Sequence, residues 1–272
     1  MIQTISEMMS HAFIQRAVLV GTLISLCAAL LGVSLVLKRY SMIGDGLSHV
    51  GFGIITVATA LGISSPLYIS IPIVMITAII LLKIGNNKTI KSDSAIALIS
   101  SGSLAIGVTV VSLTTGMNTD TCNFMFGRIL AMSQSDVLSV IVSIVVSILF
   151  VIYYRKLFIV TFDEDFAKAS GLNTSRYTNI IAILTSIVIV VGMRMMGTML
   201  ISSIIILPAL SSMRVFKTFK KVVISSGIVS VICFLLGIYF SYALNVSTGA
   251  MIVLVNLIAF VIFTILGKIL QE

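Results

Sequence analysis

One pair of chemically active side chains stands out in a chain that is otherwise almost wholly apolar. Asp45 and His49 lie four residues apart in a glycine-rich stretch. On a helix this spacing puts both side chains on one face, with their Cβ atoms about 6 Å apart. A carboxylate and an imidazole so placed can bind one divalent cation, and charge inside a membrane span is costly enough to indicate a function. We therefore predict that Asp45 and His49 are metal ligands. The alternatives are a hydrated loop near the membrane surface, or a His49 that only completes a polar network.

The composition indicates a membrane protein. Of the 272 residues, 58% are hydrophobic and 10% are charged, and the mean hydropathy is +1.21. Soluble domains carry about 25% charged residues. The apolar runs are continuous, whereas barrel strands alternate apolar and polar residues. The sequence therefore predicts an all-α, polytopic protein of the cell membrane, with residues 1–272 forming a single transmembrane domain.

Nine apolar runs are close to the length needed to cross roughly 30 Å of hydrocarbon. The weakest division is at Arg194, where one charge separates two runs, so eight spans is the alternative count. The expected spans are 17–37, 44–63, 66–82, 94–115, 137–154, 177–193, 195–213, 222–243 and 248–267.

Basic residues predict the orientation. Of the 17 Lys and Arg residues, 14 fall on one side of the nine spans, and only Arg16, Arg128 and Arg194 fall on the other. The positive-inside rule then places the N-terminus outside and the C-terminus in the cytoplasm. If 177–213 were one broken span, the four basic residues of 214–221 would lie outside, which favours nine spans. The net charge of +8 thus indicates topology and contact with anionic lipid headgroups rather than nucleic acid.

The segment 162–171 holds the densest acidic cluster and lies on the predicted cytoplasmic side. Its acids open a short helix that Gly171 is expected to end. Phe162 and Phe166 are four residues apart, and we expect them to form one apolar face. A segment of this kind suits docking on a partner, the alternative being a solvated connector. We assign the docking role to Phe162, Asp163, Glu164, Phe166 and Gly171.

Five segments carry a recognisable pattern, in order along nearly the whole chain. They are Lys38-Arg39 through Gly44-Asp45 to Ser48-His49, Asp120–Asp136, Phe162–Gly171, Gly197–Ala209 and Ser247–Val255. Together they resemble the integral-membrane permease subunits of bacterial ABC importers for zinc and manganese. Arg128, Asn245 and Ser247 depart from the family pattern.

The segment Asp120–Asp136 contains Phe126-Gly127. It is too short to span and too apolar for a free loop, so it is expected to be re-entrant or interfacial.

The resemblance implies a type II-like ABC importer permease that works as a homodimer with one pathway. Two ATP-binding cassette ATPase subunits would drive it, and an extracytoplasmic metal-binding protein would deliver the ion. No cofactor would stay bound, since the metal is cargo. The sequence is consistent with this, because it has no Gly-x-x-x-x-Gly-Lys-Ser/Thr phosphate loop and so is not expected to be an enzyme.

Two other classes of function compete with the importer permease. A gradient-driven cation transporter often has internal repeats and several intramembrane carboxylates, whereas Asp45 is the only acid expected within a span. An intramembrane metalloenzyme would need further ligands, such as those of a His-Glu-x-x-His motif. For the cargo we favour zinc, mainly on the resemblance, with manganese or ferrous iron as alternatives.

Overall fold

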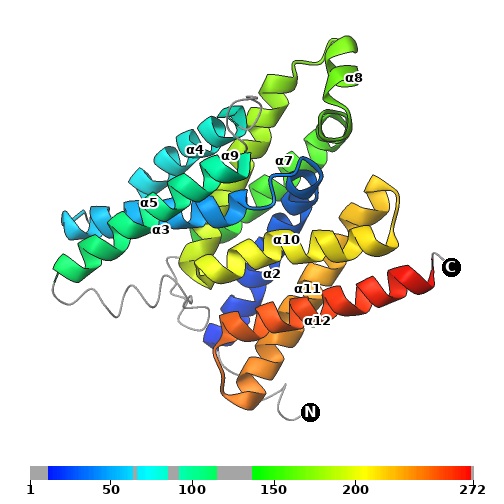
Figure 1. Ribbon diagram of the computed structural model, residues 1–272. Coiled ribbons are helices and arrows are strands. Elements are labelled where there is room, and N and C mark those ends of the chain that lie inside the picture. Colours follow the sequence, from blue (N-terminus) through cyan, green and yellow to red (C-terminus); the bar gives the residue numbers. More distant parts are fainter. Residues whose placement is uncertain (1–11, 64–65, 85–91, 115–136, 271–272) are drawn as a thin grey trace.

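The computed structural model describes residues 12–63, 66–84, 92–114 and 137–270 (Figure 1). Regular secondary structure in these residues is helical throughout. It comprises nine helices long and apolar enough to cross a membrane and one short helix, α8, which confirms the predicted fold class and span count. The helices are α2 (Ala12–Leu37), α3 (Ile43–Ala60), α4 (Leu67–Ile84), α5 (Ser92–Leu113), α7 (Val137–Phe162), α8 (Glu164–Ala169), α9 (Thr174–Met196), α10 (Thr198–Val215), α11 (Phe219–Leu244) and α12 (Thr248–Ile269). The predicted re-entrant stretch 120–136 lies outside the described residues.

Two helices end later than the apolar runs indicated. α7 continues through Arg155 and Lys156 to Phe162, and α9 continues through Arg194 to Met196. Arg and Lys are good helix formers, so a basic residue limits how far a helix is buried in hydrocarbon without ending the helix. The expected break at Arg194 was therefore misplaced by a few residues.

The actual turn between α9 and α10 is made by Gly197. This residue flanks both helices and has φ 87° and ψ 160°, a conformation that side-chain-bearing residues rarely adopt. Its N–H donates to the carbonyl of Met193 at 2.8 Å. One glycine thus separates two full spans. Because no polar loop lies between them, Arg194 was the only sign of a boundary in the hydropathy pattern.

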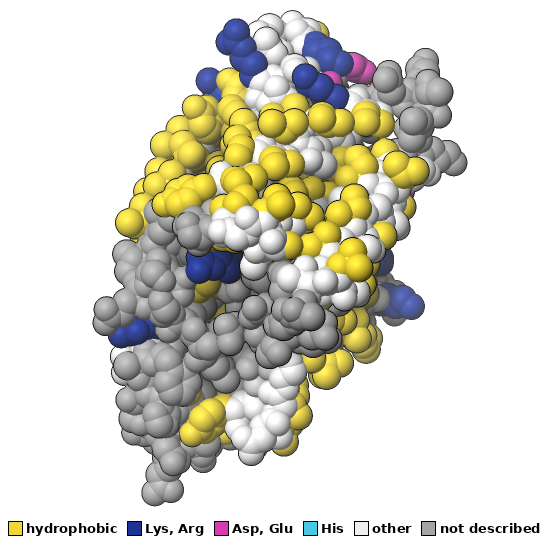
Figure 2. Space-filling view, turned by 90° about the vertical axis from the view of Figure 1, so that its left-hand side faces the viewer, with side chains coloured by type: hydrophobic (Ala, Val, Ile, Leu, Met, Phe, Trp, Pro, Cys, Tyr) yellow, Lys and Arg dark blue, Asp and Glu magenta, His cyan; other side chains and the backbone are white. Residues whose placement is uncertain are grey.

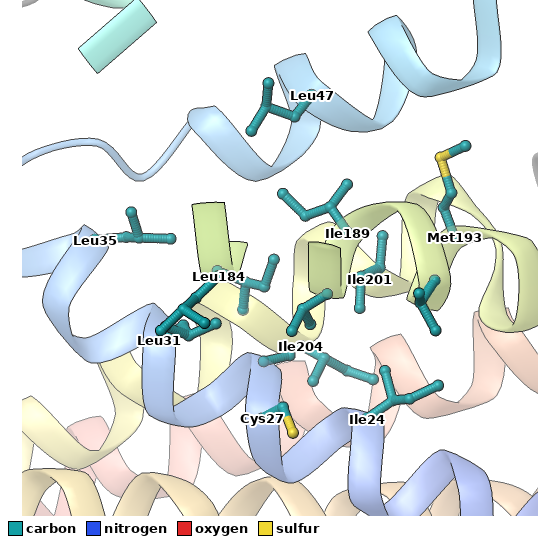
Figure 3. Close-up of a cluster of buried hydrophobic side chains, with 14 of the residues drawn as sticks. Ile24, Cys27, Leu31, Leu35, Leu47, Leu184, Ile189, Met193, Ile201 and Ile204 are labelled. Carbon is teal, nitrogen blue, oxygen red and sulfur yellow. The ribbon is translucent and has the colours of Figure 1, made fainter. Parts of the chain in front are cut away.

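α2 is largely buried and packs on α7, α9, α10 and α11. Figure 3 shows its buried side chains facing those of α9 and α10, with Leu47 of α3 closing the cluster from the other side. The labelled residues of this core are Ile24, Cys27, Leu31, Leu35, Leu47, Leu184, Ile189, Met193, Ile201 and Ile204.

The outer helices present apolar side chains to the surroundings. α5, α7 and α12 bury the smallest shares of their residues, and many of their Ile, Leu and Val side chains are exposed. Figure 2 shows a broad hydrophobic surface, with a group of Lys and Arg side chains at the end where α8 lies in Figure 1 and a few others lower on the same face. This is the distribution expected for a helical bundle whose solvent is lipid.

α3 and α5 approach closely because α3 has glycine on the contact face. A Cβ atom on Gly53 would lie 2.6 Å from the backbone carbonyl oxygen of Ser103, and one on Gly46 would lie 2.6 Å from a methyl carbon of Ile96. Small residues at helix contacts let backbones pack closely in membranes, where no hydrophobic effect drives association. The glycines around Asp45 therefore form a packing surface that fixes α3 against its neighbour.

We expect Gly53→Ala to lower the stability of the folded bundle by about 1–3 kcal/mol, because the added methyl group clashes with backbone that cannot rotate away. Gly102→Ala is the matched control: its Cβ would meet nothing within 4 Å, so it should gain about 0.5–1 kcal/mol from helix propensity. Thermal unfolding of the purified chain in detergent measures both. Equal midpoints for the two variants would contradict the close α3–α5 contact.

Candidate functional site

A tight junction between α2 and α3 positions the predicted metal ligands. Arg39 adopts a left-handed conformation with φ 62°, and the N–H of Tyr40 donates to the carbonyl of Leu35 at 2.9 Å, which ends α2. The Tyr40 hydroxyl donates to the carbonyl of Leu82 at the end of α4. The chain turns here within a few residues, and α3 begins at Ile43.

Asp45 and His49 lie on one face at the start of α3, as the spacing predicted. The Nε2 atom of His49 is 3.6 Å from the Oδ1 atom of Asp45, and their side chains are 18% and 43% exposed, respectively. Two ligands of a tetrahedral zinc, each about 2.1 Å from the metal, lie about 3.4 Å apart. Asp45 is in the first turn, where the helix dipole favours a carboxylate. A small side-chain adjustment would let both groups bind one cation.

The pair has polar neighbours but no third strong ligand in the part of the chain that the structure describes. Ser48 donates to the carbonyl of Gly44 at 2.7 Å, and its oxygen is 3.5 Å from the hydroxyl of Ser202 on α10. The sequence did not indicate the contact between Ser202 and Ser48, because it depends on how α3 and α10 pack. Within its described residues, one copy of the chain thus brings together two side chains of the kind that metals prefer as ligands.

The predicted docking segment forms a short helix with a defined start and stop. The Oδ1 atom of Asp163 accepts a hydrogen bond from the N–H of Phe166 at 2.8 Å, so Asp163 caps α8. At the other end Gly171 has φ 79°, and the N–H of Leu172 donates to the carbonyl of Ala167 at 3.0 Å. The expected roles of the acidic start and of Gly171 as the stop agree with this geometry.

The expectation that Phe162 and Phe166 share one helical face is wrong. Phe162 is the last residue of α7, whereas Phe166 belongs to α8, and the extended Asp163 between them (φ −144°, ψ 100°) breaks the helix. Both rings are nevertheless 73% and 60% exposed, respectively, and the Phe162 ring is 5.8 Å from that of Phe158. The segment therefore presents two exposed aromatic rings from two helices.

Lys38, at the junction between α2 and α3, interacts with groups on α9 and α8, which the sequence did not reveal. Nζ of Lys38, directly after α2, donates to the hydroxyl of Thr178 on α9 at 3.1 Å. Burial lowers the pKa of Lys38, while the nearby charge of Glu164 on α8 opposes this shift and Lys168 adds to it. The junction that leads into α3 therefore lies within electrostatic reach of α8.

With this geometry established, comparison with known proteins defines the family. The model of the ABC 3 transport family matches residues 10–267 of the chain. The chain belongs to this family. That confirms the resemblance found in the five sequence segments, and with the nine apolar helices it makes the protein a multi-pass protein of the plasma membrane.

Individual relatives of the ABC 3 transport family match over almost their whole length. The manganese import system permease protein ScaB of Streptococcus gordonii is 31% identical over 251 residues, which cover 92% of this chain and 90% of ScaB. The high-affinity zinc uptake system membrane protein ZnuB of Haemophilus influenzae is 27% identical over 248 residues, covering 90% and 94%, respectively. In the solved structure of PsaBC from Streptococcus pneumoniae in complex with Fab, one chain matches with a TM-score of 0.85 and 29% identity, covering 97% of this chain and 95% of that one.

We expect Asp163→Ala to loosen α8 selectively, because the Phe166 N–H loses its acceptor and an N-cap contributes about 1 kcal/mol. Hydrogen exchange at the α8 amides should become about fivefold faster. Asp163→Asn keeps an acceptor oxygen and should exchange at nearly the original rate. Asp165→Ala is the control for the loss of an acid, because Asp165 is 97% exposed and pairs only loosely with Lys168. Faster exchange of equal size in the Asp163→Ala and Asp165→Ala variants would contradict the cap.

Proposed function

We propose that this chain is the permease subunit of an ATP-driven importer and that Asp45 and His49 are the metal ligands of its pathway. The observation that carries the proposal is the position of these two groups, 3.6 Å apart at the start of a membrane-spanning helix. Ionisable groups in a span are rare and mark ion pathways. In this proposal residues 1–272 act as a single transmembrane domain.

The pathway requires a second copy of the chain. Two side-chain ligands do not complete the coordination of a transition metal, whereas four do so in a tetrahedral site. A two-fold axis that brings the Asp45–His49 faces of two copies together would supply two carboxylates and two imidazoles. The 43% exposure of the Asp45 side chain leaves it accessible for such a shared site. We therefore propose a homodimer with one metal path and no permanently bound cofactor.

The partners follow from what the chain has and lacks. It has no phosphate-binding loop of the Gly-Lys-Ser/Thr type, so ATP hydrolysis is assigned to a separate ATP-binding cassette subunit. That subunit is proposed to dock on Phe162, Asp163, Glu164, Phe166 and Gly171, where two aromatic rings are exposed beside a capped helix. An extracytoplasmic metal-binding protein is proposed to deliver the ion on the opposite side.

Manganese and zinc are the two candidate cargoes, each favoured by a different observation. Relatives named for manganese, such as ScaB, favour manganese, and carboxylate ligands suit it. The relative ZnuB is named for zinc, and an imidazole in a four-ligand site suits that metal. The ligand pair alone does not separate them, so uptake must be measured with each ion.

The test of the metal path is uptake into vesicles that contain the assembled transporter. Asp45→Ala and His49→Ala should each reduce uptake of the preferred ion at least tenfold, because half of the side-chain ligands disappear from the dimer site. Asp93→Ala removes the acid in the first turn of α5 and is the matched control, with uptake expected to be unchanged. Uptake of manganese and zinc, each in competition with the other, identifies the cargo. Normal uptake by both ligand variants in assembled complexes would exclude the pair as the path.

The test of the docking role uses Phe166. Aromatic side chains are often the residues that dominate binding at interfaces. Phe166→Ala should therefore lower both uptake and the ATP hydrolysis that the metal-loaded binding protein stimulates, each by about tenfold. The metal affinity of the separate binding protein should be unchanged. Phe240→Ala removes another exposed phenylalanine, on α11, and should leave both rates unchanged. Complexes of the Phe166→Ala variant that assemble and retain the original rates would refute the assignment.

A further inference from the structure

An apolar groove runs along the outside of the bundle between α7 and α11. Its volume is about 720 Å³, and Leu26 and Leu30 of α2 contribute to its lining. Side chains along both walls are exposed, including Ile152 of α7 at 66% and Ile228 of α11 at 55%. α3, which carries the proposed metal ligands, packs on α4, α5, α9 and α10. The groove therefore lies on helices other than those that surround the metal ligands.

One end of the groove carries two positive charges. Arg155 on α7 and Lys220 at the start of α11 both line it, and no acidic side chain is among the lining residues that the structure describes. An aromatic contact holds this end together, since the ring of Phe219 is 5.5 Å from that of Tyr154 and 4.8 Å from that of Phe158. Both cations are exposed, and neither forms an ion pair within the described part of the chain. The groove is thus apolar along most of its lining and has two basic side chains at one end, with no acidic side chain among its described lining residues.

We propose that this groove binds an anionic phospholipid of the cytoplasmic leaflet. Its acyl chains would lie between α7 and α11, and its headgroup phosphate would contact Arg155 and Lys220. The positive-inside rule puts both residues on the cytoplasmic side, where a negative headgroup lies at the level of the last apolar residues. Guanidinium and ammonium groups are the usual ligands of phosphate oxygens.

Charge complementarity distinguishes this groove from another one on the same surface. A groove of about 700 Å³ between α11 and α12 is also apolar, but among its described lining residues Lys221 is the only basic one. Bulk lipid of any headgroup suits an apolar groove with one cation, whereas two cations without an acid favour a lipid with net negative charge. The proposal does not depend on the metal path, and either can fail without the other.

The experiment uses the absence of tryptophan from the chain. Ile152→Trp places one fluorescent reporter in the groove, and Ile148→Trp places a matched reporter on exposed α7 surface outside the groove lining. Each full-length variant is reconstituted in phosphatidylcholine vesicles that contain either brominated phosphatidylglycerol or brominated phosphatidylcholine. Because each basic residue near a headgroup is worth about fivefold in lipid affinity, the groove reporter should prefer phosphatidylglycerol by at least fivefold, and the outer reporter by much less.

Paired charge removals then test the two cations. Arg155→Gln with Lys220→Gln should abolish the preference of the groove reporter. Lys156→Gln with Lys221→Gln removes the same charge one residue further along each helix and should preserve it, because Lys156 lies over the Tyr177 ring and Lys221 lines the other groove. Equal quenching by both lipids at the groove, or equal loss in both double variants, would overturn the proposal. Absence of quenching by either lipid would also overturn it, because a second copy of the chain would then cover the groove.

Discussion

The absence of water in hydrocarbon is the constraint on which the rest of this structure depends. Every backbone polar group must be satisfied within its own segment, so the described spans are helices. The same constraint acts on side chains. Many of the Ser and Thr hydroxyls donate to a carbonyl one turn earlier, as Ser48 does to Gly44 and Ser202 does to Thr198. The Asp45 carboxylate and the His49 imidazole have no such backbone partner among the hydrogen bonds of the described residues, and this is the physical reason to regard them as functional.

Close helix contact replaces the hydrophobic effect as the source of rigidity in such a bundle. α3 packs closely on α5 because Gly53 lies against the backbone of Ser103 and Gly46 lies against the side chain of Ile96. Gly197 is the single residue between α9 and α10, and its conformation lets one helix follow the other without a longer loop. Gly46 and Gly53 thus let α3, the helix that carries Asp45 and His49, pack closely on α5.

The pair and the docking segment are parts of one connected arrangement. α2 packs on α7, α9, α10 and α11, and a short junction, residues 38–42, connects its last turn to α3. Lys38 at this junction is hydrogen-bonded to Thr178 on α9 and feels the charge of Glu164 on α8. α8 packs on α7 and α9, and α9 in turn packs on α3. α9 is therefore the helix through which the proposed ATPase contact would reach the proposed metal path.

The sequence by itself determined the fold class, the nine spans, the family and the position of Asp45 and His49 on one face of α3. Hydropathy and charge predict the fold class and the spans, because lipid requires each spanning segment to be apolar and helical. The i, i+4 spacing predicts the shared face of Asp45 and His49, because that spacing is local to one helix. Tertiary structure decided the rest. The helix ends at Phe162 and Met196, the contact of Ser48 with Ser202, and the approach of Lys38 to α8 depend on packing between distant segments. The apolar face of Phe162 and Phe166 was wrongly predicted because one extended residue, Asp163, ends the helical period between them.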